Sequence, residues 1–288
     1  MAVVAIHAEV FPNTDLVRDR LVGLNVLMMA VPLFLLMSLQ LFQERGYPLR
    51  QRLVRYGWLY GFWVGLFTLA LGGWATAGSA LAHGSPGRAV AYALTGGFSP
   101  YYFLVVLAWL TVVVYCFRKA PAWLLWAVLV AAVVVVALTW HHAEGKPSVY
   151  LVFVPFLPLA FVSLLVARCG PVRMRWVVAI VVASLVAAVL EWHWHVTSGY
   201  ARASVIGSAT AVFLLGLRIT RPAPEPVRAV SDCTLGVYCI HLYFLAFFAA
   251  NVATPETFWG HSYTWLAVLL WSLVAVVGIR RAMAYKVI

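Results

Sequence analysis

The sequence has 288 residues, of which 64% are hydrophobic and only 10% are charged, and its mean hydropathy is +0.94. A soluble domain carries about 25% charged residues and cannot hide this much apolar surface, so the composition excludes a soluble globular protein and predicts an all-α membrane protein. The net charge of +11 comes from basic residues that lie between apolar runs, which indicates membrane topology and argues against nucleic-acid binding.

Apolar runs of spanning length follow one another along the chain, and they lack the alternation of barrel strands. A stub at 1–12, ended by Pro12, is too short to cross a bilayer and looks like the last half of a helix. The sequence therefore predicts a bundle of about ten transmembrane helices, the first one truncated. The nine full helices are expected over 21–43, 53–75, 97–117, 122–140, 149–168, 174–192, 200–218, 230–251 and 262–280.

Basic residues alternate between the two sides of this predicted bundle. Every second connection belongs to a set that carries 15 Lys and Arg, whereas the remaining connections carry five. Because basic residues are retained in cytoplasmic loops, the richer set is predicted to be cytoplasmic, together with both termini. This set contains Arg45–Arg55, Arg118 and Lys119, Arg168–Arg175, Arg218–Arg228 and Arg280–Lys286.

Two parts of the first third of the chain are candidates for chemistry. His7 lies at the external end of the stub, where an imidazole can accept a proton from a hydroxyl nucleophile, although an interfacial histidine is the simpler interpretation. Arg52 and Arg55 are spaced i and i+3, so they share a helix face and can clamp a polyanion. The alternative is that these arginines only set the topology.

Two further patterns lie in the second half. Thr234, Tyr238 and His241 form a polar stripe on a helix that Ser231 or Asp232 can cap, and the stripe is either helix–helix glue or a pocket wall. Glu191 lies beside histidines at an external helix end, but a metal site needs more ligands than this spacing offers, so no metal is predicted. An aromatic belt accounts for the neighbouring tryptophans.

Five segments in chain order resemble the membrane acyltransferase-3 family, whose members are multi-spanning bacterial enzymes that acylate hydroxyls of surface glycans. They are AVVAIHAEV (2–10), AVPLFLLMSLQLF (30–42), LRQRLVRYGWLYGFW (49–63), GGFSPYYFLVVLAWLTVVVYCF (96–117) and SDCTLGVYCIH (231–241). The family has an Arg eleven positions before the histidine that His7 matches, so we expect the native chain to begin upstream. The sequence also departs at Leu39, where the family has Gly, and at 101–103, where it has His-Leu-Trp.

The resemblance implies a single domain over 1–288 that is multi-pass in the inner (plasma) membrane. It implies transfer of an acyl group, with acetyl expected, from cytoplasmic acyl-CoA to a hydroxyl of a surface glycan or lipid-linked saccharide. No bound cofactor is implied. His7 matches the family base and Arg52 and Arg55 match its R-x-x-R motif for acyl-CoA, while Tyr238 and His241 are candidate channel residues.

Two other classes of function remain open at this stage. A transporter or flippase for a glycolipid or small solute would also use a bundle with polar residues inside the membrane, and it would not need His7. A haem-binding redox protein would use a pair of histidines. Release of CoA thiol separates acyl transfer from transport, and a Soret band would reveal haem.

Overall fold

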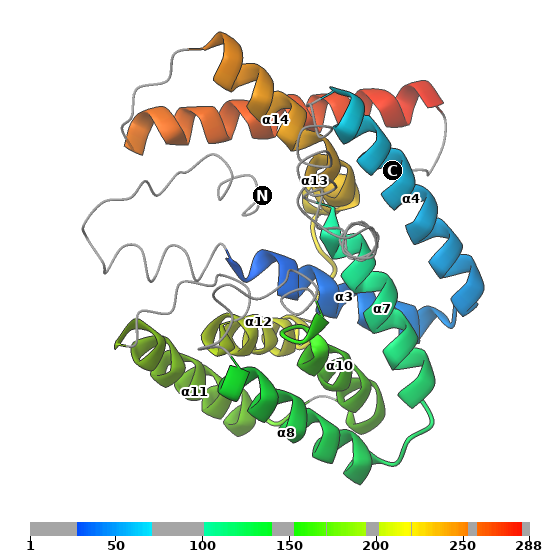
Figure 1. Cartoon of the computed structure of the whole chain (residues 1–288), viewed down its shortest axis with the longest axis vertical. Helices are drawn as coiled ribbons and strands as arrows, with labels where there is room; N and C mark the ends of the chain where they lie inside the picture. The colour runs from blue at the N-terminus through cyan, green and yellow to red at the C-terminus, as the bar shows by residue number, and fades with distance from the viewer. Residues whose placement is uncertain are drawn as a thin grey trace, which may run out of the picture. The chain divides into compact units, whose positions relative to one another are not determined.

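The computed structural model describes residues 28–70, 101–139, 153–170, 172–193, 202–219, 221–252 and 258–283 (Figure 1). Every regular element in these ranges is an α-helix, and each predicted span corresponds to one helix, so the all-α prediction is confirmed there. The stub at 1–12 lies outside the described residues. The helices are α3 (Ala30–Arg45), α4 (Leu49–Ala70), α7 (Tyr102–Phe117), α8 (Ala122–Thr139), α10 (Leu157–Cys169), α11 (Met174–His193), α12 (Ala203–Gly216), α13 (Glu225–Asn251) and α14 (Phe258–Met283).

Hydropathy and length make several of these helices membrane helices. Among the described residues, α11, α13 and α14 contain segments long and apolar enough to cross a bilayer, while α7, α8, α10 and α12 are shorter apolar helices. Large apolar side chains stay exposed along α11, including Val178, Val182 and Leu185. Such a surface suits lipid and is unusual for a monomeric soluble protein. The described chain is thus that of an integral membrane protein.

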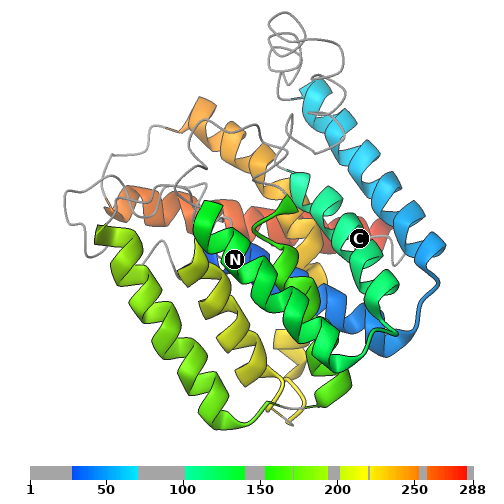
Figure 2. The same cartoon turned by 60° about the horizontal axis from the view of Figure 1, so that its bottom comes forward.

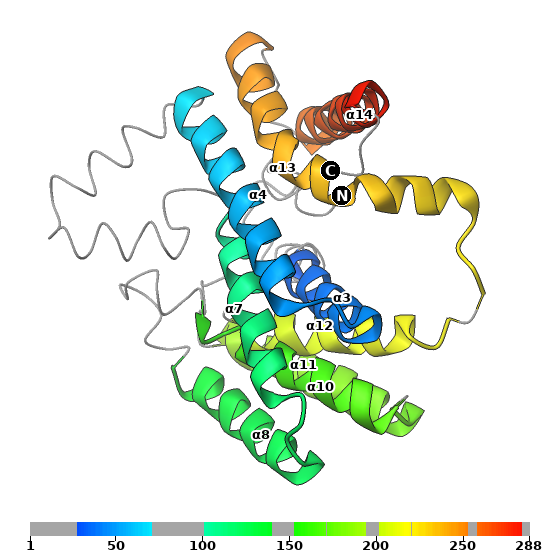
Figure 3. The ribbon, with the colours of Figure 1, turned by 90° about the vertical axis from the view of Figure 1, so that its right-hand side faces the viewer.

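The described chain divides into two compact units, which are treated separately here. Among the described residues, those within 31–218 form one unit, and those within 28–30 and 219–283 form the other. In the first unit α11 packs along α12, α8 along α10, and α7 along both α4 and α10. Figure 2 shows α11 and α12 side by side, and Figure 3 shows α4 against α7. Aromatic pairs at 5.2–6.2 Å join the helices of this unit: Phe34–Phe103, Phe67–Tyr101, and Phe117–Phe161.

Hydrogen bonds from arginines join several basic connections of the first unit. Arg168, at the end of α10, donates hydrogen bonds to the carbonyl oxygens of Ala120 and Arg118 just after α7. Arg218, just after α12, likewise donates to the carbonyl oxygen of Val172. The arginines therefore satisfy carbonyls that helix ends and connections leave unpaired.

The second unit consists of the α13–α14 pair. Its core contains Cys233, Val237 and Phe248 from α13 packed with Val268 and Leu269 from α14. The rings of Phe244 and Trp271 stack between the same two helices, with centroids 6.4 Å apart. In a membrane such an apolar seam holds two helices by close van der Waals packing, because lipid removes the hydrophobic driving force between them.

The start of α13 corrects one expectation. Ser231 and Asp232 do not cap this helix, because it begins two turns earlier at Glu225 with Pro224 as its N-cap residue. Pro226 occupies the first turn, where its missing N–H would have no helical partner in any case.

Candidate functional site

The connection between α3 and α4 gathers arginines around one tyrosine ring. Gly46 has φ 60°, a conformation that favours glycine, and it turns the chain directly after Arg45. Tyr47 is thereby brought back so that Arg45 Nη1 donates a hydrogen bond to its hydroxyl at 3.4 Å. The Arg52 guanidinium lies over the same ring, 4.5 Å from its centroid. Arg45, Tyr47, Arg52 and Arg55 are called the Tyr47 cluster below.

The electrostatics of the Tyr47 cluster favour a negative charge. The hydrogen bond from Arg45 lowers the pKa of Tyr47, and the positive charges of Arg45, Arg52 and Arg55 lower it further. The cluster also lies at the start of α4, whose first turn contains no acidic residue. Unpaired backbone N–H groups at a helix start favour anions, and guanidinium groups bind phosphate oxygens in a planar geometry. The cluster can therefore bind a phosphorylated ligand.

The sequence predicts that Arg52 and Arg55 share a helix face. Both lie in α4, where residues three apart are on the same face. Both residues lie in the first two turns, with Arg52 partly exposed and Arg55 exposed. Arg50 is exposed too, but at 100° per residue it lies on another side of the helix from Arg52. The chain thus offers a third arginine on the same helix that serves as a control for the other two.

Tyr238 and His241 form a polar contact inside α13. His241 is 1% exposed, and its ring lies 5.7 Å from the Tyr238 ring. Its Nδ1 lies 2.6 Å from the Tyr238 carbonyl oxygen. A carbonyl oxygen only accepts, so Nδ1 carries the proton and a neutral His241 has its lone pair on Nε2. Thr234, the third member of the predicted stripe, is exposed, and its hydroxyl donates to the Val230 carbonyl at 3.4 Å.

The predicted site residues fall into separately described parts of the chain. His7 lies outside the described residues. Arg52 and Arg55 belong to the unit of residues 31–218, whereas Tyr238 and His241 belong to the other unit. The two members of each pair lie close together because they belong to one helix. Arg52 and Arg55 are in the first turns of α4, and Tyr238 and His241 are one turn apart in α13.

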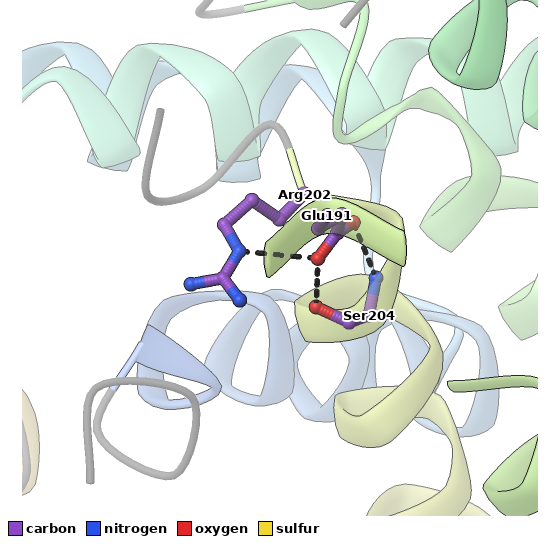
Figure 4. A network of polar contacts seen from close by, with 3 residues as sticks. All are labelled: Glu191, Arg202 and Ser204. Carbon is purple, nitrogen blue, oxygen red and sulfur yellow. Dashed lines mark hydrogen bonds and ion pairs between the residues drawn. The ribbon is translucent and has the colours of Figure 1, made fainter. Parts of the chain in front are cut away.

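A further polar group, not predicted from the sequence, joins α11 to the start of α12 (Figure 4). Arg202 Nε lies 3.1 Å from Glu191 Oε2, the Ser204 backbone N–H donates to Glu191 Oε1 at 3.0 Å, and the Ser204 hydroxyl also donates to Oε2. All three residues are buried: Glu191 is 6% exposed, Arg202 7% and Ser204 0%. They are called the Glu191 group below. The signal available was an acidic residue in an apolar helix followed by a single arginine in the next connection.

Comparison with known protein families identifies the kind of domain. A family described as acyltransferase domain matches residues 1–281. No curated protein and no solved structure is significantly similar to the chain. The matched range contains the Tyr47 cluster, the Glu191 group and the Tyr238–His241 pair, so all three lie within one family domain.

Proposed function

The chain belongs to the acyltransferase 3 family, and on this premise we propose that it transfers an acyl group, with acetyl expected, from cytoplasmic acyl-CoA to a hydroxyl of an extracytoplasmic glycan or glycolipid. Family membership makes the protein an acyltransferase, which needs an acyl donor and an acceptor. The observation that supports acyl-CoA as the donor is the Tyr47 cluster, because it concentrates positive charge at a helix start. We further propose that 1–288 is one multi-pass domain of the plasma membrane.

The distribution of basic residues indicates on which side of the membrane the acyl donor binds. Hydrogen bonds join the connection that holds Arg118 and Lys119 to Arg168, and the connection over 168–175 to Arg218. Because basic residues are retained in the cytoplasm, we place these connections and the one over Arg45–Arg55 on the cytoplasmic side. Both termini are placed there by the same rule. Arg52 and Arg55 would bind phosphates of acyl-CoA as guanidinium–phosphate pairs. The thioester then lies where it can be delivered into the bundle.

The reaction needs one base and no nucleotide hydrolysis. The acceptor hydroxyl attacks the thioester carbonyl carbon, a C–O bond forms, and the C–S bond breaks. The hydroxyl proton passes to the base, and CoA leaves as a thiolate that takes up a proton. His7 is the proposed base, by its match to the family histidine. Tyr238 and His241 are proposed to line the path of the acyl group, because both are polar residues of a largely apolar helix and His241 is buried.

The test uses purified protein in lipid nanodiscs with acetyl-CoA and a thiol reagent. The acceptor is surface polysaccharide from cells that lack the protein, compared by mass analysis with polysaccharide from cells that contain it. We expect thiol release that depends on the polysaccharide, together with acetyl groups on its hydroxyls. Movement of a glycolipid across the bilayer without thiol release would instead support a transporter or flippase.

The His7→Ala variant tests the proposed base in the same assay. We expect turnover to fall by about 10²–10⁴, the usual contribution of a general base, with the KM for acetyl-CoA nearly unchanged. Full turnover would show that His7 is an interfacial residue, and His241→Ala would then be the next variant to measure.

A further inference from the structure

The carboxylate of Glu191 is fully occupied by its neighbours. One oxygen accepts from the Ser204 backbone, and the other accepts from Arg202 Nε and the Ser204 hydroxyl (Figure 4). A carboxylate with three donors has little capacity left to take a proton from a substrate. Glu191 is thus suited to hold Arg202 and the start of α12 in place, and it is a positioning residue.

Arg202 contacts Glu191 through its Nε atom (Figure 4). The Nη2 atom is completely buried and has no hydrogen-bond partner among the residues that the structure describes. The residue as a whole is 7% exposed. A buried donor on a charged group is costly to leave unsatisfied, so such an atom marks a place where an acceptor is required.

The position of Arg202 along α12 places it far from the basic connections. Arg202 is the N-cap residue of α12, whereas Arg218 follows the other end and binds the α10–α11 connection. The 14 residues of α12 separate the two ends by about 21 Å. If the arginine-rich end faces the cytoplasm, as proposed above, Arg202 lies toward the side from which the glycan arrives.

The chemistry of the group selects the kind of ligand. A guanidinium offers only donors, so the ligand atom that meets Nη2 is an acceptor oxygen. Glu191 already balances the charge of Arg202, and an anionic ligand would therefore leave a net negative charge in a buried place. A neutral oxygen, such as a sugar hydroxyl or ring oxygen, avoids this cost.

We propose that Arg202, held by Glu191 and Ser204, binds a neutral oxygen of the saccharide acceptor. The proposal rests on the proposed function, because acyl transfer supplies the saccharide. It adds a specificity residue on the acceptor side that neither the family match nor the sequence pattern assigns.

The Arg202→Lys variant provides the main test. Lysine keeps the positive charge beside Glu191 but lacks the terminal fork that reaches the ligand. We expect the KM for the unacetylated surface polysaccharide to rise about tenfold, as for loss of one charge-assisted hydrogen bond, with the KM for acetyl-CoA and the Tm near the wild-type values. Arg218→Lys, at the other end of α12, is the matched control and should leave both KM values unchanged.

Two results would overturn the proposal. One is an unchanged KM for the polysaccharide in Arg202→Lys that retains the wild-type Tm. The other comes from the Glu191→Gln variant, which tests the proposal if Arg202→Lys fails to fold. This change leaves the Arg202 charge unbalanced, so carboxylated saccharides should gain in kcat/KM relative to neutral ones. An unaltered preference would show that Arg202 does not contact the acceptor.

A binding measurement separates this proposal from the proposed function. Without any CoA present, the polysaccharide should raise the Tm of the wild type by clearly more than that of Arg202→Lys at the same concentration. If the wild type releases no CoA thiol but keeps this Tm shift, the acyl-CoA reaction is wrong and saccharide binding stands. If thiol is released but Arg202→Lys shows the same Tm shift as the wild type, the proposed function stands and the role of Arg202 is wrong.

Discussion

Tyr47 holds two arginines by two different interactions, a hydrogen bond to Arg45 and a ring face for Arg52. Both interactions strengthen when the phenol loses its proton, which is why the pKa of Tyr47 lies below the ordinary tyrosine value. The phenolate and the phosphates of a donor then compete for the same guanidinium groups. Donor affinity should therefore fall as the pH rises through the pKa of Tyr47.

Binding of acyl-CoA should shift this titration. Phosphates on Arg45, Arg52 and Arg55 neutralise the charges that lower the pKa, so the pKa of Tyr47 should rise toward its ordinary value when CoA is bound. The measurement is ultraviolet difference titration of the wild type against Tyr47→Phe, which removes the signal of the other tyrosines. An unmoved titration with CoA at saturation would place the phosphates elsewhere.

Two arginines of α4 should matter to the donor and a third should not. Arg52→Ala and Arg55→Ala should each raise the KM for acetyl-CoA about tenfold, because a hydrogen bond to a charged group contributes about 1.5–3 kcal/mol and solvent exposure keeps the effect near the lower limit. Arg50→Ala removes the same charge from another side of the helix and should leave the KM near wild type. Equal effects from all three would indicate a topological role only.

Single residues also show what sequence reasoning can and cannot reach in the site. That Arg52 and Arg55 share a face of α4 is predictable from spacing alone, because residues three apart on a helix lie on one face. The Glu191–Arg202 pair is not, because its members are 11 residues apart across the connection between α11 and α12, and no period relates them. The role of Gly46 is likewise not predictable from the sequence, since only its φ of 60° shows how the chain turns to bring Tyr47 back to Arg45.

Among the helices, α11 and α12 approach closely where two small residues meet. A Cβ atom added to Gly207 would lie 2.3 Å from Ser184 Oγ and 3.3 Å from Ser184 Cβ. Ser184 Oγ already donates to the Ile180 carbonyl at 2.7 Å, so it does not move without losing that bond. Small residues at such crossings let membrane helices pack backbone to backbone.

Gly207→Ala should consequently lower the stability by about 1–3 kcal/mol, the usual cost of overpacking, seen as a lower Tm in detergent. The double variant Gly207→Ala with Ser184→Gly should recover most of the loss, because it removes the two nearest of the three atoms that the new methyl group meets and leaves only the Ser184 Cα at 3.9 Å. Gly216→Ala, in the same helix with no atom within 4 Å of the added Cβ, is the control and should be neutral or slightly stabilising. A destabilised Gly216→Ala of equal size would remove the packing explanation.

Helix positions were predictable to a few residues, because apolar runs in a membrane protein have to be helical. The ends of the helices were less predictable where a proline lies near them. The span expected from 230 begins as α13 already at Glu225, with Pro226 in its first turn, and α10 begins at Leu157, with Pro158 in its first turn. Proline both starts and interrupts helices, and the sequence alone does not tell these two roles apart.

For the whole molecule, the charge pattern predicts that the basic ends face the cytoplasm, and a native cysteine tests it. Cys169 is exposed at the end of α10, beside Arg168, which binds the Arg118 and Ala120 carbonyls. In a Cys116→Ser background, a membrane-impermeant maleimide should label Cys169 in inverted vesicles and not in intact spheroplasts. Cys169→Ser provides the blank. Labelling in spheroplasts alone would invert the topology.

The length of two helices has a consequence for the path of the acyl group. Both ends of α10 and α12 lie in the described chain, and the helices contain 13 and 14 residues, or about 20 and 21 Å. A hydrocarbon core is about 30 Å thick, so each of these two helices is by itself about 10 Å shorter than the core. A bilayer thins beside short helices at a modest cost per ångström of mismatch. Activity should therefore respond to the acyl-chain length of the surrounding lipids.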